Sequence, residues 1–343
     1  MAYSLTPAFQ APFTNDDVEF QVGTAGAVTL GAITAMNVDT NTTTQPDDGG
    51  GIWDTTRTVN SQQPMANFTT KDLTNAIDGL GAMGGCLGVA GWTGHAQRHD
   101  ECEGRASGNV HGEANIANGL IVPTTLTANA GEDATLSVDI HGTTIVTAGV
   151  AIAPLTVTYD TAKFASTIPS IFSLGTCRLS IDTNCDNTQD VYLELDDISS
   201  VSIEFGVEVK KRVGAGTVWP VYASIMKVRP VITINTIEVE AIHDTLGIPI
   251  LGAGVLRNNT PKTISATTAI QLRKRSDCDA WVDDATTEHI MIEINGLAYA
   301  TSVYSSTGQE DATTALRIEG TATSTSLAPM ILNTNAAYVI RQP

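Results

Sequence analysis

The residues best suited to hold a metal ion lie in one glycine-rich stretch. His95 and His99 are four positions apart, Cys102 follows three positions later, and Cys86 and His111 flank them. On a helix the first three side chains would share one face, and zinc uses such nitrogen and sulfur donors. The glycines disfavour a helix, and no paired Cys-x-x-Cys motif is present. We therefore expect ordinary loop residues and assign no metal ligand, with a structural zinc site as the alternative.

A second candidate for metal binding is the polar run from Asp182 to Asp190. Its first, third, fifth and ninth positions carry oxygen side chains, as the start of a calcium loop does. The sixth position is Asn187, where that loop needs glycine, and the twelfth is Leu193, where it needs a bidentate glutamate. We interpret the run as a hairpin loop of Asx turns. Calcium binding stays open.

Motifs that would indicate catalysis are absent from the sequence. It contains no nucleophile elbow, phosphate loop, zinc-protease motif or dinucleotide fingerprint. His243 and Asp244 are adjacent, and neighbours on a strand point to opposite faces, so they would not act as a pair. We expect His141 and His289 to lie at the end and the start of strands, packed or solvated. We predict that the protein is not an enzyme and has no cofactor.

Two short basic runs are unusual in so acidic a chain. They are Lys210-Lys211-Arg212 and Arg273-Lys274-Arg275. A surface for single-stranded nucleic acid interleaves such charges with aromatic residues, and neither run does so. We therefore expect both runs to pair with acidic surface on a neighbouring copy of the chain.

Charge and composition exclude several classes of protein. The chain has 343 residues, with 18 Lys and Arg against 37 Asp and Glu, which gives a net charge of −19. An apolar content of 42% is too high for a disordered chain. Proteins that bind the phosphates of nucleic acids need a basic surface, so the excess of acidic residues argues against nucleic-acid binding. Met1 to Pro12 has neither a basic start nor an apolar core, so we expect no signal peptide.

The five cysteines do not form a disulfide framework, because their number is odd and their spacing uneven. We expect free thiols made in a reducing cytoplasm. A hairpin disulfide between Cys177 and Cys185 is the alternative.

Threonine usage and alternating patterns predict a mainly β protein. Threonine occurs 48 times, and its branched side chain suits a strand with one wet face. Apolar and polar residues alternate in five runs, which predict half-buried strands: 136–140, 155–159, 191–195, 201–209 and 290–294. Gly214 and Gly216 signal a turn after the first basic run. We expect an antiparallel β-sandwich or barrel with one short helix and long loops.

The remaining segments divide the chain into three predicted parts. Residues 1–60 read as an N-terminal arm with a strand near Val18 to Val22, followed by a polar loop over 39–51. Residues 61–120 hold the best helix candidate, from Phe68 to Leu80, and a loop over the glycine-rich stretch 79–96, which is too glycine-rich for a membrane span. Residues 121–343 form the main β-sandwich domain.

From residue 104 to 338, about two-thirds of its length, the chain resembles the tail tube or major tail proteins of tailed phages and prophages. The resemblance lies in six segments: SVSIEFG at 200–206, VWPVYASI at 218–225, RPVITI at 229–234, LRKR at 272–275, VDDATTEHI at 282–290 and NGL at 295–297.

The resemblance implies a β-sandwich whose strands join neighbours in a hexameric ring, with one helix beside each sandwich. The rings stack into a hollow tube in the virion tail, contact other tail proteins and conduct the genome without binding it specifically. The residues favour this independently, because joining sheets around a ring covers their edges and a carboxylate-lined channel repels phosphate. The alternatives are a capsid or decoration protein of a viral shell and a secreted module that binds carbohydrate through Trp53, Trp92, Trp219 or Trp281.

Overall fold

Antiparallel strand pairing organises the molecule. The computed structural model describes residues 13–22, 26–47, 56–80, 88–100, 104–105, 111–147, 150–160, 169–182, 191–214, 216–245, 262–264, 269–276, 280–294, 298–306, 311–320 and 330–338. Within these residues, 20 strands join in one hydrogen-bonded network and six more form three separate hairpins. The predicted mainly β, antiparallel fold is confirmed. The domain boundaries stay a prediction.

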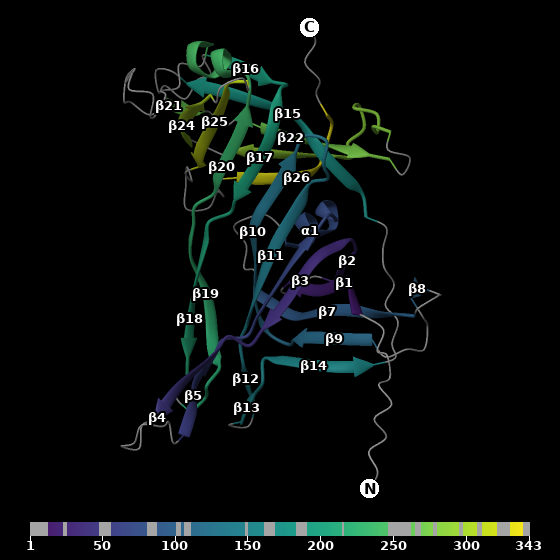
Figure 1. The fold of residues 1–343 in the computed structure, drawn as a ribbon, viewed down its shortest axis with the longest axis vertical. Helices are drawn as coiled ribbons and strands as arrows, with labels where there is room; N and C mark the ends of the chain where they lie inside the picture. Colours follow the sequence, from purple (N-terminus) through teal and green to yellow (C-terminus); the bar gives the residue numbers. More distant parts are fainter. Residues whose placement is uncertain are drawn as a thin grey trace.

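The lower half of the molecule, in the view of Figure 1, is built from ten strands and the α-helix α1 (Leu73–Leu80). The strands are β1 (Phe13–Val22), β2 (Val28–Leu30), β3 (Ile33–Asp39), β6 (Met65–Thr70), β7 (Gly88–Asp100), β8 (Gly104–Arg105), β9 (His111–Ile116), β10 (Gly119–Asn129), β11 (Thr135–Gly142) and β14 (Leu155–Asp160). Their pairings run in the orders β14–β9–β7–β1–β2 and β3–β6–β11–β10.

The upper half holds ten more strands and a five-residue π-helix, η1 (Ala241–Thr245). The strands are β15 (Ile171–Asp182), β16 (Val191–Leu195), β17 (Ile198–Glu204), β20 (Val231–Thr236), β21 (Lys262–Ile264), β22 (Ala269–Arg275), β23 (His289–Ile294), β24 (Ala298–Ser305), β25 (Thr313–Gly320) and β26 (Met330–Ala336). Five residues of β10 pair with β17, and this ladder connects the sheets of the two halves.

Three two-stranded hairpins project from this network. They are β4 (Thr42–Asp47) with β5 (Thr56–Gln62), β12 (Ile145–Thr147) with β13 (Val150–Ile152), and β18 (Val207–Val213) with β19 (Pro220–Val228). The β18–β19 hairpin contains the turn predicted at Gly214 and Gly216 and runs down one side of the molecule toward β4 and β5 (Figure 1). Isolated hairpins are only marginally stable in water, so each of them depends on what it contacts.

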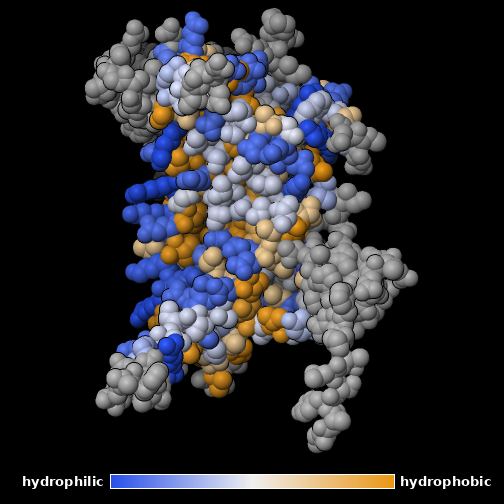
Figure 2. Space-filling model, in the orientation of Figure 1, coloured by the Kyte–Doolittle hydropathy of each residue, from blue (hydrophilic) through white to orange (hydrophobic). Residues whose placement is uncertain are grey.

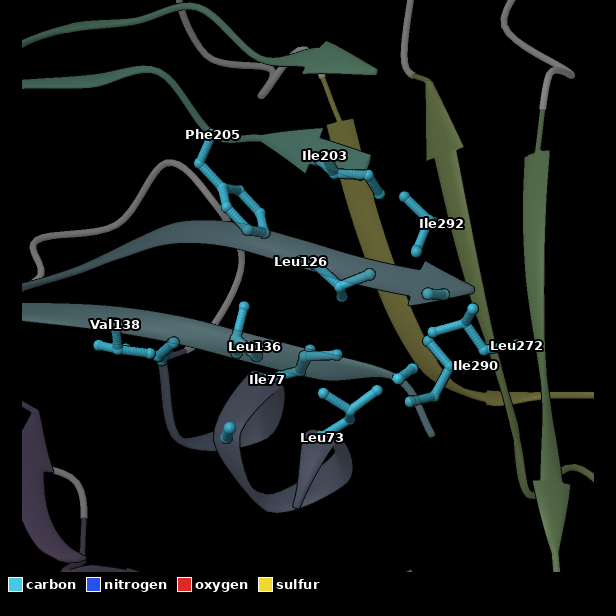
Figure 3. Packing of buried hydrophobic residues seen from close by; sticks show 14 of the residues in the cluster. Leu73, Ile77, Leu126, Leu136, Val138, Ile203, Phe205, Leu272, Ile290 and Ile292 are labelled. Atoms are coloured by element: carbon cyan, nitrogen blue, oxygen red, sulfur yellow. The ribbon is translucent and has the colours of Figure 1, made fainter. Parts of the chain in front are cut away.

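The core lies between α1 and the strands that cover it. Leu73, Ala76, Ile77 and Leu80 are buried at helical spacing on one face of the helix. Leu73 and Ile77 point toward Leu136 of β11, with Leu126 and Ile290 beyond it (Figure 3). Each of these side chains is at most 7% exposed, so the helix closes one hydrophobic cluster shared by both halves.

The helix begins five residues later than the sequence predicts. Residues up to Thr70 form β6, and Thr70 accepts a hydrogen bond from the backbone N–H of Asp72 while donating to the carbonyl of Gly31. Asp72 stands directly before the first helical residue, and its carboxylate accepts from the side chain of Asn75. Burial raises the pKa of Asp72. The helix prediction was wrong for 68–72 because Thr69 and Thr70 belong to β6, and Thr70 also forms hydrogen bonds in the turn before the helix.

Two segments predicted as loops are partly strand. Residues 42–47 of the polar run form β4, and residues 88–96 of the glycine-rich stretch belong to β7. Trp92 of β7 is fully buried, and a side chain at Gly94 would lie 2.7 Å from its ring. Glycine is therefore needed there for close packing, not for flexibility.

The expected N-terminal arm also differs from the structure. Over residues 13–39, β1, β2 and β3 pair within the lower half, and Val18, Phe20 and Leu30 lie in the shared core. This part of the segment is therefore not peripheral.

The strand predicted over 201–209 is divided at Gly206. This residue has a φ of +58°, and its carbonyl accepts a hydrogen bond from the backbone N–H of Arg229. The left-handed conformation ends β17 and redirects the chain into β18, so the alternating pattern continues through a change of sheet.

We expect Gly206→Ala to destabilise the protein by more than about 2 kcal/mol, because a left-handed φ is strained and the new Cβ would lie 2.1 Å from the carbonyl oxygen of Arg229. Gly216→Ala is the matched control. Gly216 has a φ of +80°, and no neighbouring atom lies within 4 Å of the place that a Cβ would take, so its loss should be only about 1 kcal/mol. Urea unfolding measures both. Equal losses of stability in the two variants would show that the short distance between Gly206 and the Arg229 carbonyl does not require glycine.

Candidate functional site

The predicted cluster of histidines and cysteines does not lie on a helix, because its first part forms a strand. His95 and His99 both lie in β7, where residues four apart are separated by about 13 Å and cannot bind one ion. The alternative of a helical zinc face is therefore wrong. Cys86 and Cys102 lie outside the described residues, and His111 is the first residue of β9. In the described part of the chain, no three His, Cys, Asp or Glu side chains gather closely enough to hold a metal.

His95 is instead half of a buried polar pair. Its Nδ1 is hydrogen-bonded to Oδ1 of Asp17 on the neighbouring strand β1. The two side chains are 5% and 1% exposed. The pair satisfies two polar groups inside the lower core, and no sequence signal indicates it because the partners are 78 residues apart.

The run from Asp182 to Asp190 separates β15 from β16, which are antiparallel neighbours. Residues 183–190 lie outside the described residues, so the calcium hypothesis stays a prediction. Cys177 of β15 is a free, buried thiol whose pKa is raised by burial, and it forms no disulfide with Cys185.

The first basic run is divided between a half-buried lysine and two exposed cations. Lys210 and Arg212 are exposed on β18, whereas Lys211 turns inward toward Asp139 and His141 of β11. Burial lowers the pKa of Lys211, and the negative charge of Asp139 opposes that shift. Burial raises the pKa of Asp139, and Lys211 opposes that shift in turn. Electrostatic attraction between the half-buried Lys211 and Asp139 therefore favours the position of β18 beside β11.

His141 is the neutral member of this group. Burial, reinforced by the positive charge of Lys211, lowers its pKa to about 4. It lies near the end of β11 and is buried, and its Nδ1 has no hydrogen-bond partner among the described residues. The predicted position of His141 at the end of a strand is confirmed.

The second basic run, in β22, is neutralised within the chain. Arg273 forms a 2.8 Å ion pair with Asp284, and Lys274 a 3.0 Å pair with Glu288. The guanidinium groups of Arg273 and Arg275 stack over Trp281, at 4.7 and 5.1 Å from the ring centroid. Arg273 and Lys274 thus have acidic partners within the chain, and the expected pairing with a neighbouring copy stays a prediction.

The other two predicted histidine positions have structural roles. His289 begins β23, as expected, and is buried: its Nδ1 accepts from the backbone N–H of Lys274 and its Nε2 lies 3.2 Å from the carbonyl of Asp283. His243 and Asp244 lie in η1, not on a strand as predicted, and Nε2 of His243 is 3.4 Å from the hydroxyl of Thr314.

Exposed apolar side chains concentrate at the lower end of the molecule. Sixteen large apolar residues are exposed in the described chain, and ten of them lie in β5, β12, β13, β14 and the tip of β18–β19. Figure 2 shows hydrophobic residues gathered at this end, over β12 and β13. Exposed apolar side chains gathered at one end of a molecule are typical of an interaction site.

The three hairpins meet at this end through backbone and side-chain hydrogen bonds. The backbone N–H of Gln62 in β5 donates to the carbonyl of Val218 at 2.8 Å, and its side chain accepts from the indole of Trp219 at 2.8 Å. The N–H of Thr144, directly before β12, donates to the carbonyl of Pro220 at 2.8 Å. Their apolar side chains are thus presented on a fixed framework. Of the strands at this end, the sequence pattern located only β14 and the start of β18, without showing that apolar faces are exposed here.

None of the helices that the structure describes is long and apolar enough to cross a membrane. No protein-family model matches the chain, and no curated protein matches its sequence.

His95→Ala should lower the free energy of unfolding by about 3 kcal/mol or more, because the Asp17 carboxylate would stay buried without this partner. In a double-mutant cycle with Asp17→Ala, we expect a coupling energy of about 1–3 kcal/mol. The control is Glu319→Ala, which breaks the exposed Arg317–Glu319 pair and should cost less than about 1 kcal/mol. Additive losses in the cycle would argue against a coupled pair.

His141 should make the protein less stable as the pH falls from 6.5 to 4. In this window the unfolded chain takes up a proton that His141 of the folded chain does not bind, so acidification favours unfolding. His141→Gln should remove about 2–3 kcal/mol of this pH dependence. Urea unfolding of both proteins between pH 7 and pH 4 measures it. Parallel curves would show that His141 does not contribute.

Proposed function

We propose that the protein is a structural virion subunit of the tail-tube kind, which assembles with identical copies into stacked hexameric rings around a channel for the genome. The observation that carries the proposal is the set of unfinished sheet surfaces at the lower end: hairpins with exposed apolar side chains and an edge strand, β14, paired only with β9 among the described strands. Such surfaces would make a monomer prone to aggregation, whereas an assembling subunit uses them as contacts with its neighbours.

The placement of the resembling segments supports this proposal. Residues 200–206 and 229–234 fall in β17 and β20, where the upper half gives rise to its long hairpin, and 218–225 lie in β19 at the far end of that hairpin. Residues 272–275 end β22, and 282–290 lead into β23. Of these five segments, four therefore belong to the upper half and the fifth to the hairpin that projects from it.

Electrostatics supports a channel that DNA passes without binding. Six copies carry six times −19, or −114, formal charges. Screening confines this repulsion to about 10 Å, so the carboxylates nearest the DNA matter most. Arg273 and Lys274 are paired with Asp284 and Glu288, which leaves them less available for phosphate.

The alternative of a carbohydrate-binding module finds little support in the tryptophans that the structure describes. Trp92 is fully buried, and the indole N–H of Trp219 donates a hydrogen bond to the side chain of Gln62. Trp281 is 44% exposed, but Arg273 and Arg275 stack on it. Trp53 lies outside the described residues.

Negative-stain electron microscopy of the purified full chain at several concentrations tests the proposal. We expect rings or tubes with an axial channel, and duplex DNA should show no saturable binding to them at physiological salt because the assembly is acidic. A closed shell would favour a capsid or decoration protein instead. A monodisperse monomer at high concentration would refute assembly altogether.

A further inference from the structure

The hairpin β12–β13 is a rigid apolar projection. The two residues before it, Thr143 and Thr144, are each 5% exposed, and the N–H of Thr143 donates to the carbonyl of Asn118. The hydroxyl of Thr144 donates to the carbonyl of Ile152 at 2.6 Å, which closes the base of the hairpin. A root fixed in this way pre-organises the hairpin, so a partner need not order it on binding.

Both faces of this hairpin present apolar side chains. Ile145 pairs with Ile152, and Val150 is on the same face as both, two residues from Ile152. Val146 points to the opposite face. These four side chains are between 42% and 66% exposed, so no described part of the chain covers either face.

Strand β14 extends the same surface. The four residues from Thr156 to Tyr159 are all exposed, so both faces of the strand are uncovered, and Val157 and Tyr159 are 57% and 68% exposed. Among the described strands β14 pairs only with β9, so its other edge has backbone groups available for a further strand. We call Ile145, Val146, Val150, Ile152, Val157 and Tyr159 the β12–β14 surface.

Charge identifies the occupant of this surface. From His141 to Tyr159 the sequence has no Asp, Glu, Lys or Arg, although the whole chain carries −19. Copies of so acidic a chain repel each other, and they approach best through a patch without carboxylates. An anionic membrane would require lysine or arginine beside the apolar residues, and this segment has none.

We infer that the β12–β14 surface docks one copy of this chain on a second copy, whose extended strand lies along the free edge of β14 and whose apolar side chains cover the hairpin. The inference rests on the proposed function, because rings and stacks need head-to-tail contacts in which this surface meets a different one. Other exposed apolar residues, including Val303 and Tyr304 of β24, lie in the upper half, at the opposite end (Figure 1).

The test compares the variant Val150→Asp/Val157→Asp with the matched control Met226→Asp. All three positions are more than half exposed, so far-ultraviolet circular dichroism and thermal melting of each variant should match the wild type. In sedimentation velocity, the double variant should need a concentration about tenfold or more above that of the wild type to assemble, because two charges enter an apolar contact. Met226→Asp should assemble like the wild type.

A mixing experiment tests the head-to-tail geometry. The double variant keeps the complementary surface, so adding it to wild-type protein should cap growing ends and shorten the assemblies. Failure to shorten them, or assembly of the double variant at wild-type concentration, would overturn the inference while leaving the proposed function intact. Flotation of the wild type, but not of the variant, with phosphatidylcholine vesicles would instead identify a lipid surface as the occupant. If the variant blocks assembly of particles that are not tubes, the inference stands and the tail-tube proposal fails.

Discussion

Hydrogen bonding at sheet edges is the constraint on which this structure depends. Every strand needs partners for the N–H and C=O groups on both of its sides, and an antiparallel network satisfies them only in its interior. The described network is long and continuous, and the ladder between β10 and β17 connects its two halves. At the edge strands of the described network, which include β2, β3, β14, β16 and β26, and at the three hairpins, water or another chain must supply the missing partners.

The acidic exterior of the molecule results in part from how the chain uses its cations. Several of the chain's few cations are used internally: Arg273 and Lys274 are paired with carboxylates, and Lys211 is half-buried and attracted by the charge of Asp139. The exterior therefore stays acidic. In the proposed assembly, the uncharged apolar hairpin β12–β13 is the place where copies of this acidic chain repel each other least.

The parts of the fold that were predictable are those where packing follows the local period. In β11 and β17, alternate residues are buried as the sequence pattern indicates, and the apolar spacing of α1 located the helix although not its start. The start was misplaced because Thr70 bonds to Gly31, a residue 39 positions earlier. Local patterns contain no information on such partners.

The candidate site was much less predictable. Val157 and Tyr159 alternate with threonine as a buried strand does, yet they are exposed, because a pattern marks an apolar face without saying what covers it. The pairing of His95 with Asp17 likewise depends on β1 lying beside β7. The glycines around Trp92 suggested a loop, whereas the segment is a strand in which the ring needs the small size of Gly94.

The closure of the core around α1 has a consequence for biosynthesis. The hydroxyl of Thr334 donates to the carboxylate of Asp78 at 2.7 Å, across 256 residues of chain, and β26 contacts the helix. Contacts so distant in sequence form slowly and late. During translation, the contact between α1 and β26 must wait until the residues around Thr334 have left the ribosome. A chain that ends before β26 therefore lacks part of its finished interior, which delays completion of the native fold.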